Sequence, residues 1–360
     1  MVRSPPPEVL ATWPKPNYVD PITRGPVLII VELIFLPLAL ICLALRLYVK
    51  IRIMCKKEID DWLMAAAAFF GMGVTICVVL AFARYGWDIH VWDVRPSVMI
   101  TGRQVSFAAQ ALFMPATTFA KISILISYLR LAPINSLFRK LTLISIWFVA
   151  ITNAIFVIVL FTQCIPVSSY WNLATNERDC VTEGPSLLAQ AVVTVVSDFV
   201  VWVLPLPALY HAKLPLHQRV ALIILFSFGA VVVFAACMRI YWIHYVVLET
   251  YDVTWEGFHL WMWTAVEVQL GIICGCVPWL KSLVKFWWSR RTVTDLSNGG
   301  TGASRGYARS DAPRTVTEGG TVFRMDSVAK SPRSPGFREK GTYIDLERCS
   351  GSSDPERGLG

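Results

Sequence analysis

Five ionisable residues stand out within stretches of sequence that are mostly apolar and long enough to cross a bilayer. They are Glu32, Lys121, Asp198, Arg239 and Glu267. A charge in the bilayer core is costly, so such residues usually pair with one another or border a water-filled cavity. We therefore expect either ion pairs that fix helix packing or the lining of a ligand cavity or a switch.

Four of these five residues have candidate partners. Arg239 and Glu267 fall in the outer halves of the sixth and seventh apolar stretches when each is placed by the 1.5 Å rise of a helix. These stretches are consecutive and antiparallel, so an ion pair between the two residues is expected. Lys121 lies in the inner half of the third stretch and Asp198 near the middle of the fifth. They can pair if those two helices touch.

The usual motifs of metal and cofactor chemistry are missing. The histidines show no HxxxH or HExxH spacing for zinc, and no P-loop or GxGxxG motif occurs. A retinal Schiff base requires a buried lysine, but the last stretch holds Glu267 and Gln269, and its first lysine, Lys281, lies at the inner boundary. We expect no catalytic residues, no metal and no cofactor, retinal included.

Seven long apolar runs carry the ionisable residues. A bilayer core about 30 Å thick needs about 20 apolar residues in a helix, and without water each backbone must bond internally. Barrel strands need only about 10 residues of alternating polarity and are excluded. The sequence predicts an all-α integral membrane protein, a seven-transmembrane helix bundle, with spans at about 27–49, 62–83, 104–129, 141–163, 187–210, 220–243 and 258–280.

Lysine and arginine in the loops predict the orientation of this bundle. The loops after the first, third and fifth spans are basic, and Arg46 and Lys50 stand at the edge of the first of them. The fourth loop has one arginine and the sixth has none. Cytoplasmic loops carry an excess of such residues. We expect a short extracellular N-terminus at 1–26, a membrane domain at 27–284, a cytoplasmic C-terminus and the plasma membrane as location.

The segment 285–360 differs in composition from the rest. It is rich in serine, glycine, arginine and proline, and such a composition cannot bury enough apolar surface to fold. The sequence predicts a disordered cytoplasmic tail. Ser331 and Ser334 each precede a proline and are phosphorylation candidates, although such dipeptides also recur by chance in disordered tails. The net charge of +8 reflects the basic loops and this tail, so no nucleic acid is expected as a partner.

Two loops on the expected outer face carry further candidates. The sequence GWDIHVWDV at 86–94 contains His90 and Asp93 beside tryptophans, which suits either ligand contact or anchoring at the membrane interface. Cys164 and Cys180 are the only loop cysteines on that face. A disulfide between them fits an oxidising compartment and would contribute roughly 3 kcal/mol.

Several motifs occur in a consistent order along the spans. They are DDW at 60–62, GWDIHVWDV at 86–94, KISILISYLRL at 121–131, CIPVSSYW at 164–171 with Cys180, SDFVVWVLPLP at 197–207, LFSFGAVVVFAACMRIYWI at 225–243 and WMWTAVEVQLGIICGCVP at 261–278. Together they resemble the fungal rhodopsin-domain family, which includes Pth-type receptor-like proteins and a satratoxin-cluster membrane protein. The resemblance covers about 27–285 and implies a seven-helix domain of fungal origin. It does not imply a particular reaction or ligand.

These observations favour a receptor-like protein associated with a secondary-metabolite, or mycotoxin, gene cluster. Its expected partners are the lipid bilayer, a small-molecule ligand and a cytoplasmic signalling protein. Two alternatives stay open. One is a small-molecule transporter or export accessory, and the other is a membrane enzyme that uses Asp198 or Glu267 on a lipophilic substrate.

Overall fold

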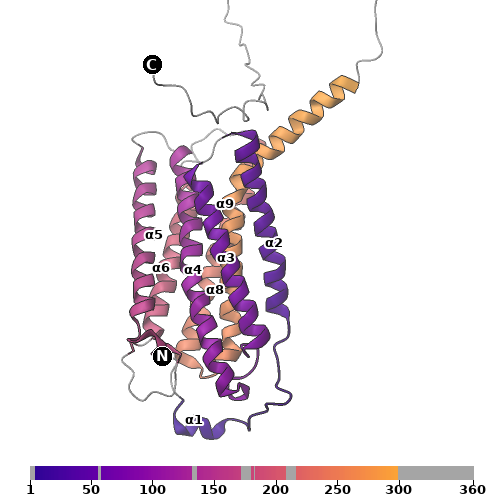
Figure 1. Ribbon diagram of the computed structural model, residues 1–360. Helices are drawn as coiled ribbons and strands as arrows, with labels where there is room; N and C mark the ends of the chain where they lie inside the picture. The colour runs from indigo at the N-terminus through magenta and orange to yellow at the C-terminus, as the bar shows by residue number, and fades with distance from the viewer. Residues whose placement is uncertain are drawn as a thin grey trace, which may run out of the picture. The chain divides into compact units, whose positions relative to one another are not determined.

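A computed structural model describes residues 5–55, 58–131, 136–171, 180–181, 183–207 and 216–298. Seven helices in this part of the chain are long and apolar enough to cross a membrane, and they lie side by side in a bundle (Figure 1). They are α2 (Val27–Tyr48), α3 (Ile59–Arg84), α4 (Pro96–Leu131), α5 (Leu137–Thr162), α6 (Glu183–Val203), α8 (Leu216–His244) and α9 (Val253–Asn298). The predicted all-α, seven-helix membrane fold is confirmed.

Several helix ends differ from the predicted spans for local reasons. Helix α4 starts at Pro96, well before residue 104, because proline suits the first turn of a helix, where its missing N–H is not needed. Helix α6 ends at Val203 instead of continuing to 210, since Pro205 cannot supply a helical hydrogen bond. Helix α2 continues directly into a π-helical turn over Val49–Ile53, so Lys50 belongs to a helical segment rather than to a loop.

The chain divides into two compact units, Met1–Val284 and Lys285–Gly360, and the site described below lies in the first. Helix α9 continues to Asn298, beyond residue 285, where the tail was predicted to begin. The remainder of the predicted tail, with Ser331 and Ser334, lies outside the described residues.

The bundle is packed most densely around α3, α4 and α9. Of the seven spans, α4 and α9 have the largest share of buried residues in their most apolar part, and α5 has the smallest. Small residues such as Ala67 and Ala120 are buried in this core beside Met64, Phe113 and Ile272. Ionisable side chains on α4 and α9 are therefore held inside protein rather than against lipid.

The two ends of the bundle carry different segments. We call the end with the N-terminal segment, residues 85–95 and residues 250–252 the N-side, and the opposite end the C-side (N-side at the bottom of Figure 1). The short helix α1 (Pro7–Thr12) lies at the N-side. The N-terminal segment is tied to residues 85–95, because Arg24 N donates to Asp88 O at 3.0 Å and Asn17 N donates to Asp93 Oδ1 at 2.8 Å.

A disulfide closes another N-side loop. Cys164 and Cys180 are bonded, as predicted. Their backbones form an isolated antiparallel bridge, and Val181 N donates to Gln163 O at 2.9 Å. The disulfide therefore fixes the connection between α5 and α6 close to the end of the bundle.

Candidate ligand site and the buried charges

Four of the predicted site residues form two buried ion pairs. Arg239 on α8 donates from Nε to Glu267 Oε2 at 2.8 Å and from Nη2 to Glu267 Oε1 at 3.3 Å. Their side chains are 5% and 2% exposed, so water does not screen the pair. The predicted pairing of the sixth and seventh spans is confirmed. The guanidinium also lies over the ring of Phe113, 4.5 Å from its centroid.

The second pair joins α4 to α6. Lys121 Nζ lies 3.0 Å from Asp198 Oδ1, so the condition that the third and fifth spans touch is met. Lys121 also donates to Ser197 Oγ at 2.8 Å and to Thr194 O at 3.2 Å, which uses all three of its N–H groups. Asp198 Oδ2, by contrast, is buried without a hydrogen-bond partner. We call Lys121, Asp198, Arg239 and Glu267 the charge quartet.

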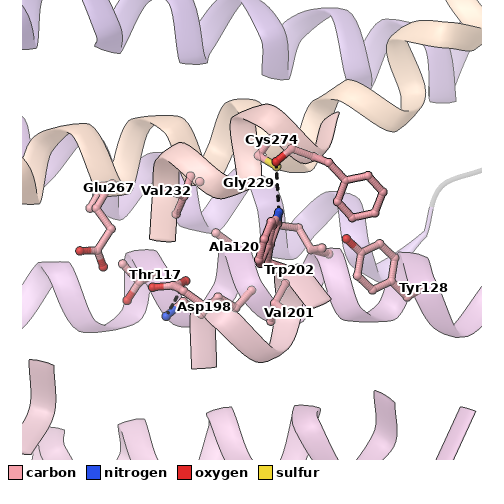
Figure 2. A pocket seen from close by; sticks show the side chains of 15 residues that line it. Thr117, Ala120, Tyr128, Asp198, Val201, Trp202, Gly229, Val232, Glu267 and Cys274 are labelled. Atoms are coloured by element: carbon pink, nitrogen blue, oxygen red, sulfur yellow. Dashed lines mark hydrogen bonds and ion pairs between the residues drawn. The ribbon is translucent and has the colours of Figure 1, made fainter. Parts of the chain in front are cut away.

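A small pocket lies on one side of the quartet. This central pocket has a volume of about 60 Å³, and Lys121, Asp198 and Glu267 line it together with apolar residues of α4, α6, α8 and α9. Figure 2 shows Asp198 and Glu267 at one end of the pocket and Tyr128 at the other. Trp202 borders it as well and donates from Nε1 to Phe226 O at 3.1 Å.

A much larger cavity lies toward the N-side. This N-side cavity has a volume of about 1010 Å³, and Arg239 lines it together with tryptophans and tyrosines of the loops and helix ends. Arg239 borders the N-side cavity while its partner Glu267 borders the central pocket. The Arg239–Glu267 pair therefore has one partner in the lining of each space.

Several polar side chains of the N-side cavity are paired with one another. Arg103 Nη2 lies 3.2 Å from Glu183 Oε1, and Gln110 Nε2 donates to Gln190 Oε1 at 3.5 Å. Burial, together with the nearby Glu183 carboxylate, raises the pKa of Tyr170, so its hydroxyl keeps its proton at neutral pH. Such walls suit a ligand that is mostly apolar and has a few polar atoms.

His90 and Asp93 are not among the residues that line the cavity. The His90 ring is stacked between Trp255 at 3.9 Å and Trp92 at 4.5 Å, and its Nδ1 lies 2.5 Å from Asp252 Oδ2. Asp93 accepts from the backbone of the N-terminal segment, as described above. Both residues hold the N-side loops together. The contacts of His90 and Asp93 are therefore packing contacts between loops and not contacts with the cavity. Trp92 itself lines the cavity.

Glu32 lies apart from the quartet. Its Oε2 accepts from Thr75 Oγ1 at 2.6 Å, and Thr75 in turn accepts from Gln269 Nε2 at 3.1 Å. The second carboxylate oxygen of Glu32, Oε1, and the amide oxygen of Gln269 are both buried without hydrogen-bond partners. Glu32 therefore links α2, α3 and α9 through a neutral hydroxyl rather than through an ion pair.

Sequence reasoning missed a second cluster of buried charges, at the C-side. Arg46 Nη2 lies 2.6 Å from Asp60 Oδ2, and Lys50 Nζ lies 2.9 Å from the same oxygen and 3.2 Å from Asp61 Oδ2. Glu58 and Arg130 complete this C-side cluster. Arg46 and Lys50 were counted as loop charges, which was wrong, because both are almost fully buried.

The acidic members of the C-side cluster do not form a free metal site. Ligand atoms of Glu58, Asp60 and Asp61 lie within 4.8 Å of one another. Three cationic side chains contact these carboxylates and balance their three charges. Arg46 Nη1 also donates to Gly275 O at 2.8 Å, so the cluster clamps α2, α3, α4 and α9 at one end.

A bundle of seven spans with buried ion pairs and a deep cavity defines a multi-pass helical membrane protein. Residues 45–286 match the fungal rhodopsin domain, and the chain belongs to this family.

Three relatives illustrate the family. The chain is 27% identical over 233 residues to a SAT4 family membrane protein of Emericella nidulans, with 63% of this chain and 58% of that relative covered. It is 26% identical over 239 residues to satratoxin biosynthesis SC1 cluster protein 4 of Stachybotrys chartarum (65% and 83% covered). It is 22% identical over 287 residues to receptor GIN3 of Arthrobotrys oligospora (77% and 65% covered). No solved structure gives a significant match.

Proposed function

We propose that this chain is a receptor-like membrane protein that binds a small amphipathic molecule in the N-side cavity. The cavity carries the proposal: about 1010 Å³ of space with aromatic walls and a buried arginine. Ligand sites in proteins commonly measure about 300–1,000 Å³ and combine apolar walls with a few placed polar groups. The names of two relatives, a receptor and a satratoxin cluster protein, support a sensing role linked to secondary metabolism.

The proposal includes an orientation and a direction of signalling. The N-side faces the outside of a plasma membrane, and the C-side faces a cytoplasmic signalling protein. The basic first turn of α5, with Arg139 and Lys140, supports this orientation, since cytoplasmic loops are enriched in such residues. The charge quartet lies between the cavity and the C-side, where ligand binding can alter it.

The proposal also states that the protein binds its ligand without catalysing a reaction on it. Within the described ranges, the group of three close carboxylates is the C-side cluster, and cations already neutralise it. Asp198 and Glu267 each face a cation at ion-pair distance. We therefore assign these two carboxylates to packing and switching rather than to acid–base catalysis, and we assign the protein no cofactor.

A thermal-shift experiment on the purified full chain in lipid nanodiscs tests the cavity. Fractions of an organic extract from a fungal culture are added, and the melting temperature is measured. Ser106 lines the cavity, so Ser106→Trp should take up part of its space and weaken the response to an active fraction. Phe69→Trp, on an exposed site of α3, is the matched control and should keep the response. A response of unchanged size in Ser106→Trp would place the ligand elsewhere.

A small-molecule transporter is the second candidate, and one observation favours it. The two partners of one ion pair line different spaces, as they would at a closed gate. The active compound from the thermal-shift experiment separates the two functions. Compound-dependent nucleotide exchange on an added G protein supports the receptor, whereas flux of the compound into proteoliposomes supports the transporter.

A further inference from the structure

The unpaired donor groups of Arg239 at the N-side cavity indicate the chemistry that its ligand must supply. This inference rests on the proposed binding in that cavity, which Arg239 lines. Arg239 uses Nε and Nη2 on Glu267, and its Nη1 makes no hydrogen bond within the described part of the chain. Arginine nitrogens can only donate, so a matching ligand must accept.

The charges around the cavity point the same way. The arginine and acidic residues that line the cavity are Arg103, Glu183 and Arg239. Arg103 and Glu183 neutralise each other at 3.2 Å. The counter-charge of Arg239 is Glu267, which lines the central pocket and is not among the residues that line the N-side cavity. The cavity wall thus presents one positive charge that no residue of the wall balances.

We propose that the ligand is an amphipathic organic acid whose carboxylate binds Arg239 and whose apolar body lies along the aromatic walls. A guanidinium has five N–H groups in a planar fork, and Glu267 occupies two of them. The remaining three include both those of Nη1. A carboxylate matches that free edge in a charge-assisted, bidentate arrangement.

The same geometry makes Glu267 a competitor of the ligand. Two carboxylates on one guanidinium repel each other in surroundings that water does not screen. Asp198 and Lys121 both lie within electrostatic range of Glu267, with opposite signs. A bound acid therefore weakens the Arg239–Glu267 pair, and a released Glu267 carboxylate faces the central pocket that it lines. Binding at the N-side is thereby converted into a rearrangement of the charge quartet.

Paired probes test the acid assignment on the full chain in nanodiscs. The probes are cis-parinaric acid and 1-pyrenebutyric acid, each with its methyl ester, and binding is followed by their fluorescence. The native chain should bind at least one acid saturably and about tenfold or more tightly than its ester, because a hydrogen bond to a charged group is worth about 1.5–3 kcal/mol. Arg239→Gln should abolish this preference. Glu267→Gln should instead strengthen binding of the acid, because it removes the competitor.

Two further variants keep the test decisive. Arg84→Gln removes an exposed cation in the last turn of α3 that does not line the cavity, and it should leave the acid-to-ester ratio unchanged. If Arg239→Gln does not fold, the double variant Arg239→Gln/Glu267→Gln retains a neutral, hydrogen-bonded pair and should show no acid preference. A merely structural role of the pair would weaken binding in both single variants.

The remaining outcomes separate this inference from the proposed function. Equal saturable affinity for acid and ester overturns the acid assignment and leaves the cavity as a ligand site. No saturable binding of either acid also overturns the assignment, and the extract experiment then decides the proposed function by itself. Acid binding of unchanged affinity in Ser106→Trp overturns both, because the probe then binds outside the cavity.

Discussion

Breaking the Arg239–Glu267 pair one residue at a time should be more damaging than removing it altogether. Both side chains are almost fully enclosed and share two hydrogen bonds, at 2.8 and 3.3 Å. Arg239→Met leaves the Glu267 carboxylate without a cation at ion-pair distance, which should cost about 3–5 kcal/mol. Glu267→Leu should cost a similar amount. The double change replaces the pair with apolar groups and should recover much of the loss.

A double-mutant cycle measures this directly. The free energy of unfolding, or the melting temperature, is determined for the native chain, both single variants and the double variant in the same detergent. Arg103→Met is the matched control, because the Arg103–Glu183 pair is more exposed and its loss should cost less. Two severe single effects that add in the double variant to within about 0.5 kcal/mol would show that the residues are not energetically coupled, and would refute the reasoning.

Three other outcomes follow from the structure. Asp60→Asn should lower the free energy of unfolding by about 3–5 kcal/mol, because three buried or half-buried cations lose the carboxylate they share. Trp62→Leu, at an exposed neighbouring site, should cost under about 1 kcal/mol, and equal melting temperatures for these variants would contradict this account. Mass spectrometry of the unreduced protein should find one linked peptide pair at Cys164 and Cys180, and reduction should cost roughly 3 kcal/mol; two free thiols there would reject it. Protease added to intact cells should remove a tag at the N-terminus and spare one at the C-terminus, and a protected N-terminal tag would reverse the proposed orientation.

The sequence was sufficient for the helices and for one of the two buried charge systems. Apolar length alone indicates the spans, because the bilayer sets a minimum length for each. A charge in the middle of such a span is conspicuous, and its helix and depth restrict its partners. Arg239 and Glu267 could therefore be paired before any coordinates were known.

The C-side cluster was missed because its residues lie where charges are ordinary. Arg46 and Lys50 stand at the predicted end of the first span, and Asp60 and Asp61 at the start of the second. Membrane boundaries normally expose such residues to water. Only the continuation of α2 through the π-helical turn, and the approach of α4 and α9, encloses them. A ligand cavity was expected from the buried charges, but the lining of the N-side cavity could not be predicted, since its walls come from loops and from several helices whose packing no local pattern encodes.

The order of the quartet along the chain constrains how the protein enters the membrane. Lys121 on α4 is synthesised before Asp198 on α6, and Arg239 on α8 before Glu267 on α9. Each basic residue therefore waits in or beside the bilayer without its partner, at a cost of about 2.5–3.5 kcal/mol on insertion scales. Helix α9 leaves the ribosome after the other six spans and brings the carboxylate that neutralises Arg239. A chain that stops before Glu267 thus carries a stranded charge, which quality-control machinery of the membrane can recognise.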